Sequence, residues 1–246
     1  MRLVLIFAMA LAGCATLTEE EPRTVISMHE NILEFDGDIT EESADEFFRI
    51  DKIGVSKIRL NSRGGDAELA IRVGYWIFDN KIDVEVLDYC NSSCANYLFP
   101  AGQGKFLHKD SAMVLHGGAF QKNFLEDYEL DKVRILEEEF FQHIGVSGLI
   151  TTYGQDRQVR KKYGTWWDIG FYYSKEDMLK VGIDNVILVD DTWDWLPFRE
   201  DITNIYRPEI NLNSGDWLRL SAMRSEHYEL AKARVLNQPD GRKPDK

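Results

Sequence analysis

The sequence predicts a mixed α/β fold in which most strands run parallel. Between residues 25 and 115, short apolar stretches rich in β-branched residues alternate with stretches whose apolar side chains recur at helical spacing. The chain has 246 residues, 44% of them hydrophobic, which suffices for one good core. We therefore expect one main domain over residues 24–190, followed by a C-terminal extension over residues 191–236.

The N-terminus has the pattern of a targeting segment rather than of a folded element. Arg2 precedes an almost wholly apolar run from Leu3 to Leu11, which leads into Leu11-Ala-Gly-Cys14. The run is too short to span a bilayer as a mature helix. Its ending resembles the lipobox of bacterial lipoproteins, which implies that residues 1–13 are a cleaved signal peptide and that Cys14 is lipidated. An ordinary secretory signal with an incidental cysteine is the alternative.

On the lipoprotein interpretation, residues 14–23 form a polar tether, and a lipid anchor at Cys14 holds the protein on the periplasmic side of the bacterial envelope. Ala15 stands where an aspartate would resemble an inner-membrane retention signal, so the outer membrane is favoured. The formal net charge of −13 excludes nucleic acid as a partner, because its phosphates would be repelled. A solvated acidic surface is the simplest explanation of that charge.

The first predicted elements are two short strands around a turn, at residues 25–28 and 31–35. A helix over residues 41–50 follows, because Ala44, Phe47, Phe48 and Ile50 share one apolar face and Thr40 is suited to begin it. Residues 55–61 predict the next strand, which ends in the glycine turn at residues 64 and 65.

Further along, the same alternation of strand and helix continues. Residues 66–78 predict a helix with Leu69, Val73, Trp76 and Ile77 facing inward. The remaining predicted elements of this part are a strand at 83–87, a short buried helix at 93–101, and strands at 105–107 and 112–115.

The pattern changes after residue 120. A charged stretch from Asn123 to Ile144 predicts a long helix with an apolar stripe of Val133, Leu136, Phe140 and Ile144. Its length suggests that it projects from the body. The remaining predicted elements are a helix at 174–181, a strand at 185–189, a helix at 215–235 and a polar, disordered tail at 237–246.

Cys90 and Cys94 flank the stretch that we expect to carry chemistry, Cys90-Asn-Ser-Ser-Cys94. In an oxidising compartment this pair is more readily bridged than free. So short a loop gains at most about 2 kcal/mol by chain entropy, and the bridge would chiefly fix the backbone around Ser93. Their spacing also suits two metal ligands, but Cys14 is the only other cysteine. We expect neither a metal ion nor a cofactor.

Several motifs in sequence order resemble one family. These are Gly37-Asp-Ile, Ile58-Arg-Leu-Asn-Ser-Arg-Gly-Gly65, a serine nine residues before Gly102, Met113-Val-Leu-His116, and Ser174-Lys-Glu-Asp-Met-Leu-Lys-Val-Gly-Ile-Asp184. Together they resemble the proteolytic subunit of the Clp protease and the wider Clp/crotonase superfamily, from about residue 31 to 188. The resemblance implies a spiral of short β-β-α units, a homo-oligomer, and hydrolysis of a peptide or protein substrate.

The site follows from the chemistry that such a serine needs. Ser93 would be the nucleophile, His116 the base that takes its proton, and Asp168 the carboxylate that orients the imidazole. The Gly65 and Cys94 N–H groups would form the oxyanion hole, one on a glycine turn and one at a helix start.

The chain departs from the family pattern at several places. Arg63 replaces a proline, cysteines flank the serine as in periplasmic proteins bearing Cys-x-Ser-x-Cys, and Asp168 is offset by about two positions. The C-terminal fifty residues have no counterpart.

Other interpretations of the same residues stay open. Ser93 is also placed to cap a helix, Ser92 is an alternative nucleophile, and His116 and Asp168 also suit a strand end and a turn. The rival functions are a catalytically inactive binding or scaffold protein of the envelope and an enzyme acting on acyl thioesters. A Ser–Lys dyad with Lys105 is the third rival.

Overall fold

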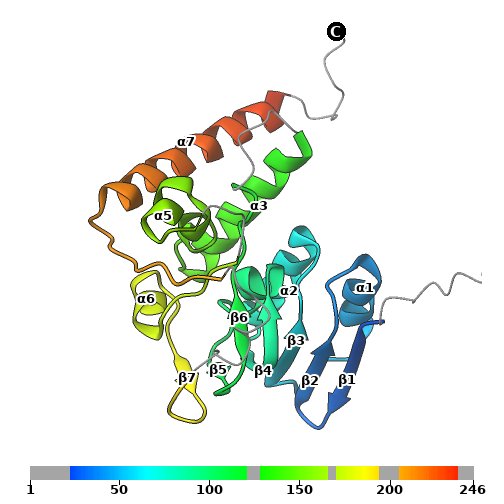
Figure 1. Ribbon diagram of the computed structural model, residues 1–246. Helices are drawn as coiled ribbons and strands as arrows, with labels where there is room; N and C mark the ends of the chain where they lie inside the picture. Colours follow the sequence, from blue (N-terminus) through cyan, green and yellow to red (C-terminus); the bar gives the residue numbers. More distant parts are fainter. Residues whose placement is uncertain (1–22, 121–127, 166–169, 194–204, 238–246) are drawn as a thin grey trace, which may run out of the picture.

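The computed structural model describes residues 23–120, 128–165, 170–193 and 205–237 (Figure 1). The expected signal peptide, Cys14 and the tether up to residue 22 lie outside these ranges, as do Asp168 and the tail beyond residue 237. Within the described part of the chain, no helix combines the length and apolar character needed to cross a membrane.

A seven-stranded, largely parallel sheet forms the centre of the molecule. Its order is β1-β2-β3-β4-β5-β7, and β6 also pairs with β4. Among these strands of the described residues, β1 and β2 pair antiparallel and every other pair is parallel. The strands are β1 (Val25–His29), β2 (Ile32–Asp36), β3 (Lys57–Ser62), β4 (Asp83–Asn91), β5 (Lys105–Leu107), β6 (Ala112–Val114) and β7 (Val186–Leu188). The predicted α/β class with a parallel-rich sheet is confirmed.

The long strand β4 organises the sheet around itself. It pairs with β5 near its start, where Val84 lies opposite Lys105, and with β6 at its end, where Asn91 lies opposite Val114. Along β3, Ile58 and Leu60 are buried while Arg59 between them is half-buried and bonds Glu85. One face of the sheet therefore carries the core, and the other carries charged side chains.

Helices cover the core face and stand above the carboxyl ends of the strands (Figure 1). Thr40 and Ser43 form a capping box at the start of α1, as Thr40 predicted. Asp66 and Ser174 cap the starts of α2 and α6. The side chain of each accepts a hydrogen bond from the backbone N–H three residues on. The helices are α1 (Glu41–Arg49), α2 (Ala67–Asp79), α3 (Tyr128–Ile144), α4 (Leu149–Thr152), α5 (Arg157–Lys162), α6 (Lys175–Lys180) and α7 (Gly215–Asn237).

The described residues also form two shorter helices, the π-helix η1 (Cys94–Leu98) and the 3₁₀ helix η2 (Tyr153–Gln155). The sequence patterns did not indicate α4, η2 or α5. Each spans a few residues, which is too short for an apolar periodicity to be recognised.

Helix α3 packs through charged side chains as well as through its apolar stripe. Phe140 and Ile144 of the predicted stripe are buried, but so are Asp131, Arg134 and Glu137. α3 lies beside α7, and the two helices extend together away from the sheet (Figure 1). Charged side chains of α3 meet charged side chains of α7 in this contact.

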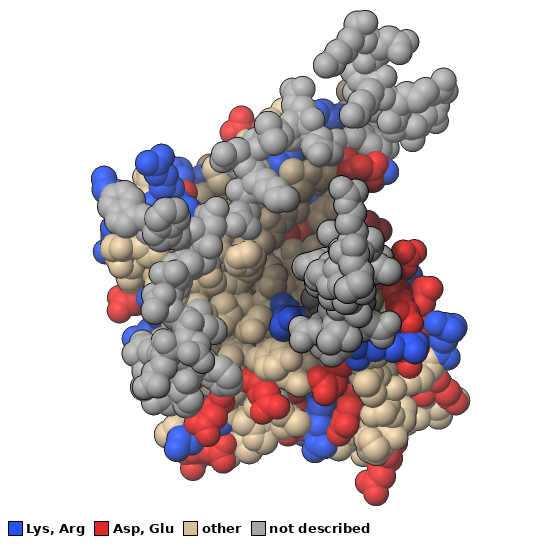
Figure 2. Space-filling view, turned by 45° about the vertical axis from the view of Figure 1, so that its right-hand side comes forward, with Lys and Arg blue, Asp and Glu red and all other residues tan. Residues whose placement is uncertain are grey.

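The charged surface is mixed in sign. On the face drawn in Figure 2, acidic and basic side chains are interspersed below and to the right, and the central hollow is mostly uncharged. Such a distribution suits the solvated acidic surface that the net charge of −13 suggested.

Candidate active site

The candidate residues follow the carboxyl ends of three adjacent strands, β3, β4 and β6. Cys90 of β4 lies opposite Ser62 of β3 and Met113 of β6. The carboxyl ends of these parallel strands therefore meet, and the turns that follow them meet as well. These turns contain residues 63–66, 92–94 and 115–118.

The glycine turn after β3 lies directly against the serine turn after β4. Gly64 and Gly65 have φ values of +99° and +144°, which favour glycine. A Cβ on Gly64 would lie 2.6 Å from the Asn91 carbonyl oxygen and 2.8 Å from the Ser93 nitrogen. A Cβ on Gly65 would lie 2.1 Å from the Ile39 carbonyl oxygen. Only glycine permits this approach.

Arg63 holds the outside of the same turn. Its guanidinium donates to both carboxylate oxygens of Asp38, at 3.1 Å and 2.6 Å. Asp38 comes just before Ile39, whose N–H donates to the Gly64 carbonyl oxygen at 2.7 Å. The ion pair and the backbone bond thus fix the turn at two adjacent points.

Ser92 and Ser93 form the sharp turn from β4 into η1. Ser92 has φ of +52°, its N–H donates to Val114 and its carbonyl accepts from Asn96, each at 2.8 Å. Ser93 makes no side-chain capping bond, so it does not act as the helix cap. Its Oγ donates instead to the Gly65 carbonyl oxygen at 2.8 Å. Gly65, Ser93 and Cys94 are therefore brought together.

A disulfide joins Cys90 and Cys94, as expected for a cysteine pair in an oxidising compartment. Both cysteines are fully buried, and the bridge ties the end of β4 to the first residue of η1. The helix is wound with five-residue bonds, since the Phe99 N–H donates to the Cys94 carbonyl oxygen at 3.1 Å. Such π-turns are frequent at functional sites.

The backbone of His116 is held by Asn96, a buried polar residue of η1. The Asn96 side chain donates to the His116 carbonyl oxygen at 2.9 Å and accepts from the His116 N–H at 3.2 Å. The imidazole itself is half-buried, and no described side chain is hydrogen-bonded to it. The Asn96 side chain thus joins η1, which follows Ser93, to the backbone of His116.

Asp168 lies outside the described residues. The described chain resumes at Gly170, where a Cβ would lie 2.1 Å from Val114 Cγ1. Phe171 then pairs antiparallel with Leu115, with N–O distances of 3.0 Å and 2.7 Å. From Gly170 onward, the chain therefore runs beside Val114 and Leu115, which precede His116. The role of Asp168 stays a prediction.

Lys105 is the first residue of β5. Its Nζ donates to the Asp184 carbonyl oxygen at 3.0 Å. Burial lowers the pKa of Lys105, although Asp184 acts to raise it. Val84, its strand partner, and Ser92 are separated by eight positions of β4 and its turn, roughly 26 Å at strand rise. A Ser–Lys dyad with Lys105 does not fit this arrangement.

Cavities among the described residues include two that lie away from this site. One of about 490 Å³ includes Lys105, Phe78 and Leu179, and one of about 280 Å³ includes Ser174 and Arg207. Neither includes Ser93 or His116.

The sequence patterns missed two residues that connect the site, Asn96 and Glu137. Asn96 was detectable in principle, because it is a lone amide in an otherwise apolar helix. Glu137 begins a run of three glutamates, which has the pattern of solvated surface, yet it is completely buried.

Comparison with known proteins finds similarity to solved structures only at the level of the fold. No protein-family model matches the chain. No curated protein matches it either. The ClpP protease catalytic domain of Plasmodium falciparum overlaps with a TM-score of 0.43 and 18% identity, over 64% of this chain and 84% of that one. A mutant ClpP1 of Listeria monocytogenes gives 0.40 and 19%, over 66% and 94%. Overlaps this loose carry no weight for activity.

Proposed function

We propose that this protein is a serine hydrolase that acts on peptide bonds. The proposal is carried by one observation, the packing of the Gly64-Gly65 turn against the Ser92-Ser93 turn, with Ser93 Oγ 2.8 Å from the Gly65 carbonyl oxygen. A hydroxyl at a sharp strand-to-helix turn, beside glycine backbone, is the arrangement that acyl-transfer chemistry needs.

Ser93 is the proposed nucleophile and His116 the proposed base. Ser93 Oγ has to leave the Gly65 carbonyl for the imidazole, which exchanges one neutral hydrogen bond worth about 1 kcal/mol for another. The freed Oγ attacks a carbonyl carbon while His116 takes its proton, and His116 then returns the proton to the leaving amine. The Gly65 and Cys94 N–H groups are the proposed oxyanion donors, and Asp168 the proposed orienting carboxylate.

Ser92 is the second candidate for the nucleophile, and one observation favours it. Its φ of +52° is the conformation of a strained residue between a strand and a helix, where strain gathers at functional sites. Ser92 is also more exposed than Ser93. In that assignment the bond from Ser93 Oγ to the Gly65 carbonyl is structural.

The cellular setting belongs to the same proposal. We infer a lipid anchor at Cys14, location on the periplasmic side of the envelope, and assembly into a homo-oligomer. The buried Cys90–Cys94 disulfide supports an oxidising compartment.

A catalytically inactive binding or scaffold protein is the rival function. It is favoured by the fact that no described carboxylate is hydrogen-bonded to the His116 ring, and by the engagement of Ser93 Oγ with a carbonyl. In that case the two turns and the disulfide only stabilise the fold.

A fluorophosphonate probe separates these functions. The oxidised mature chain is labelled, and the adduct is located by mass spectrometry. We expect an adduct on Ser93 that is lost in Ser93→Ala and His116→Ala and kept in Ser92→Ala. An adduct on Ser92 transfers the nucleophile to that residue. No adduct on folded, disulfide-bonded protein rejects the hydrolase and leaves the binding protein.

A further inference from the structure

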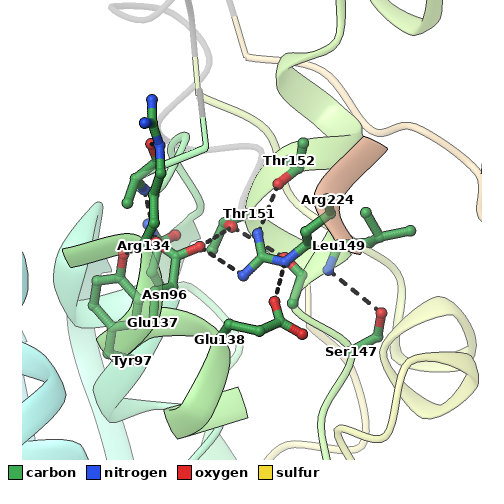
Figure 3. Close-up of polar contacts among 12 residues, drawn as sticks. Asn96, Tyr97, Arg134, Glu137, Glu138, Ser147, Leu149, Thr151, Thr152 and Arg224 are labelled. Carbon is green, nitrogen blue, oxygen red and sulfur yellow. Dashed lines mark hydrogen bonds and ion pairs between the residues drawn. The ribbon is translucent and has the colours of Figure 1, made fainter. Parts of the chain in front are cut away.

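Glu137 of α3 has a buried carboxylate whose hydrogen-bond partners come from four separate segments (Figure 3). Its Oε2 accepts from the Tyr97 hydroxyl at 2.8 Å and from the Ala119 N–H at 2.7 Å. Its Oε1 accepts from Thr151 Oγ1 at 3.2 Å and from Arg224 Nη2 at 2.9 Å. A buried carboxylate this well satisfied is held in one position.

Arg224 of α7 supplies the opposite charge. Besides Glu137 it donates to Glu138 Oε2 at 2.6 Å and to Thr152 Oγ1 at 3.0 Å, and its guanidinium lies 4.0 Å over the Phe120 ring. The side chain is 4% exposed. A buried carboxylate without such a partner would be strongly disfavoured.

Two glycines leave the room that this ion pair occupies. A Cβ on Gly118 would lie 2.2 Å from Glu137 Oε2, and a Cβ on Gly148 would lie 2.4 Å from Arg224 Nη2. Neither glycine has a positive φ, so space rather than backbone conformation requires them. Each offers a way to disturb one partner without changing a charge.

The partners of Glu137 Oε2 belong to the candidate site. Tyr97 is on η1, one turn after Ser93, and Ala119 is three residues after His116. One oxygen atom therefore binds both the helix that begins with the serine and the loop that follows the histidine. Asn96, next to Tyr97, binds the backbone of His116 as well.

We propose that Glu137 is a positioning residue for Ser93 and His116, and that Arg224 of the C-terminal helix keeps Glu137 in place. This inference rests on the proposed hydrolase function. It makes α7, the segment outside the family resemblance, a necessary part of the site. Displacement of a nucleophile or base by about 1 Å can reduce a rate about a hundredfold, so a carboxylate that holds both segments controls reactivity without touching a substrate.

The test compares two arginines of the same helix. Arg224→Met removes the positively charged partner of Glu137. Arg234→Met is the matched control, because Arg234 bonds Asp131 of α3 at 2.5 Å and 2.8 Å and makes no bond to Glu137. Both variants lose an ion pair between α3 and α7. We expect fluorophosphonate labelling to slow at least about tenfold in Arg224→Met and to keep its wild-type rate and pH profile in Arg234→Met.

A conservative variant and a glycine variant complete the series. Arg224→Lys keeps the charge and should recover part of the labelling rate. Gly118→Ala pushes on Glu137 from the histidine side, and it should slow labelling and shift its pH profile although every ionisable group remains. Equal labelling in Arg224→Met and Arg234→Met would overturn the proposal.

Hydrogen exchange separates failure of this inference from failure of the hydrolase. In the full chain, residues 94–98 and 116–119 should both exchange faster in Arg224→Met than in Arg234→Met, whether or not any serine is labelled. Faster exchange without labelling of the wild type would reject the hydrolase and keep the structural coupling. Unchanged exchange in both segments would reject the coupling itself.

Discussion

At the scale of single residues, the site depends on close contact between the glycine turn after β3 and the serine turn after β4. A Cβ on Gly64 would meet Asn91 and Ser93, whereas Gly54 has a similar positive φ and a Cβ there would meet nothing within 4 Å. The two positions therefore separate the cost of an unusual φ from the cost of a steric clash.

Gly64→Ala should destabilise the protein more than Gly54→Ala does. Both substitutions pay about 1 kcal/mol for alanine at positive φ, and Gly64→Ala adds a methyl group 2.6 Å from a carbonyl oxygen. We expect a total loss of about 3 kcal/mol for Gly64→Ala, measured by urea unfolding. Equal losses at the two positions would mean that the serine turn moves aside without cost.

At the scale of elements, two connections hold the site, the disulfide at the start of η1 and the contact between α3 and α7. The disulfide closes a very short loop between buried cysteines. The helix contact buries Asp131, Arg134 and Glu137, and it joins Asp131 to Arg234 and Glu137 to Arg224. The first connection is covalent and local, and the second is ionic and remote in sequence.

Reduction of the Cys90–Cys94 bridge should cost little stability and much reactivity. The chain-entropy estimate for so short a loop is about 2 kcal/mol. Labelling of the serine should fall by a larger factor than this loss of folded population explains, because Cys94 carries a proposed oxyanion donor. The reduced and oxidised proteins are compared in urea unfolding and in probe labelling, and a reduced form with full labelling would contradict the prediction.

Asp131 should make the contact between α3 and α7 sensitive to acid. Burial would raise the pKa of Asp131, but hydrogen bonds from Arg234 and Arg134 outweigh it and hold the pKa below the ordinary aspartate value. Its contribution is therefore complete above that ordinary value and is lost as the pH falls through the lowered pKa. Asp131→Asn should cost roughly 3 kcal/mol at pH 7 and flatten this part of the acid unfolding curve.

The control for this prediction is Arg234→Met. Removing this cation should flatten the acid dependence in part, because Arg234 is one of the two arginines that lower the pKa of Asp131 and Arg134 remains. The free energy of unfolding is measured against pH for wild type and both variants. An unchanged acid dependence in Asp131→Asn would assign it to other carboxylates.

At the scale of the whole molecule, α7 shares the core of the sheet domain. Trp217 and Leu220 of α7 belong to the same cluster of buried apolar side chains as Leu60 and Val86 of the sheet. We therefore expect the described chain to unfold as one cooperative unit, with coincident transitions by tryptophan fluorescence and circular dichroism.

Leu220→Ala and Leu218→Ala test this unity on one helix. Leu220 is fully buried, so its truncation should cost about 3 kcal/mol and lower the single transition of the whole protein. Leu218 is 59% exposed, so its truncation should cost less than about 0.5 kcal/mol. A separate early transition in Leu220→Ala would show α7 to be an independent unit.

The sequence by itself determined the local features of this protein. The alternation of short strands and helices predicted the parallel-rich sheet, Thr40 predicted the start of α1, and Cys90 and Cys94 predicted their own bridge. These features depend on neighbours a few positions away, so periodicity, capping and a close pair of cysteines are visible in one sequence.

Only the tertiary structure decided how the site is held. The bond from Asn96 to His116 spans 20 positions, and the bond from Glu137 to Arg224 spans 87. Nothing in the local pattern of Glu137, Glu138 and Glu139 distinguishes the buried member of the run from its neighbours. Burial of a charge is decided by partners that folding brings from elsewhere, because the charge is stable inside only where those partners meet it.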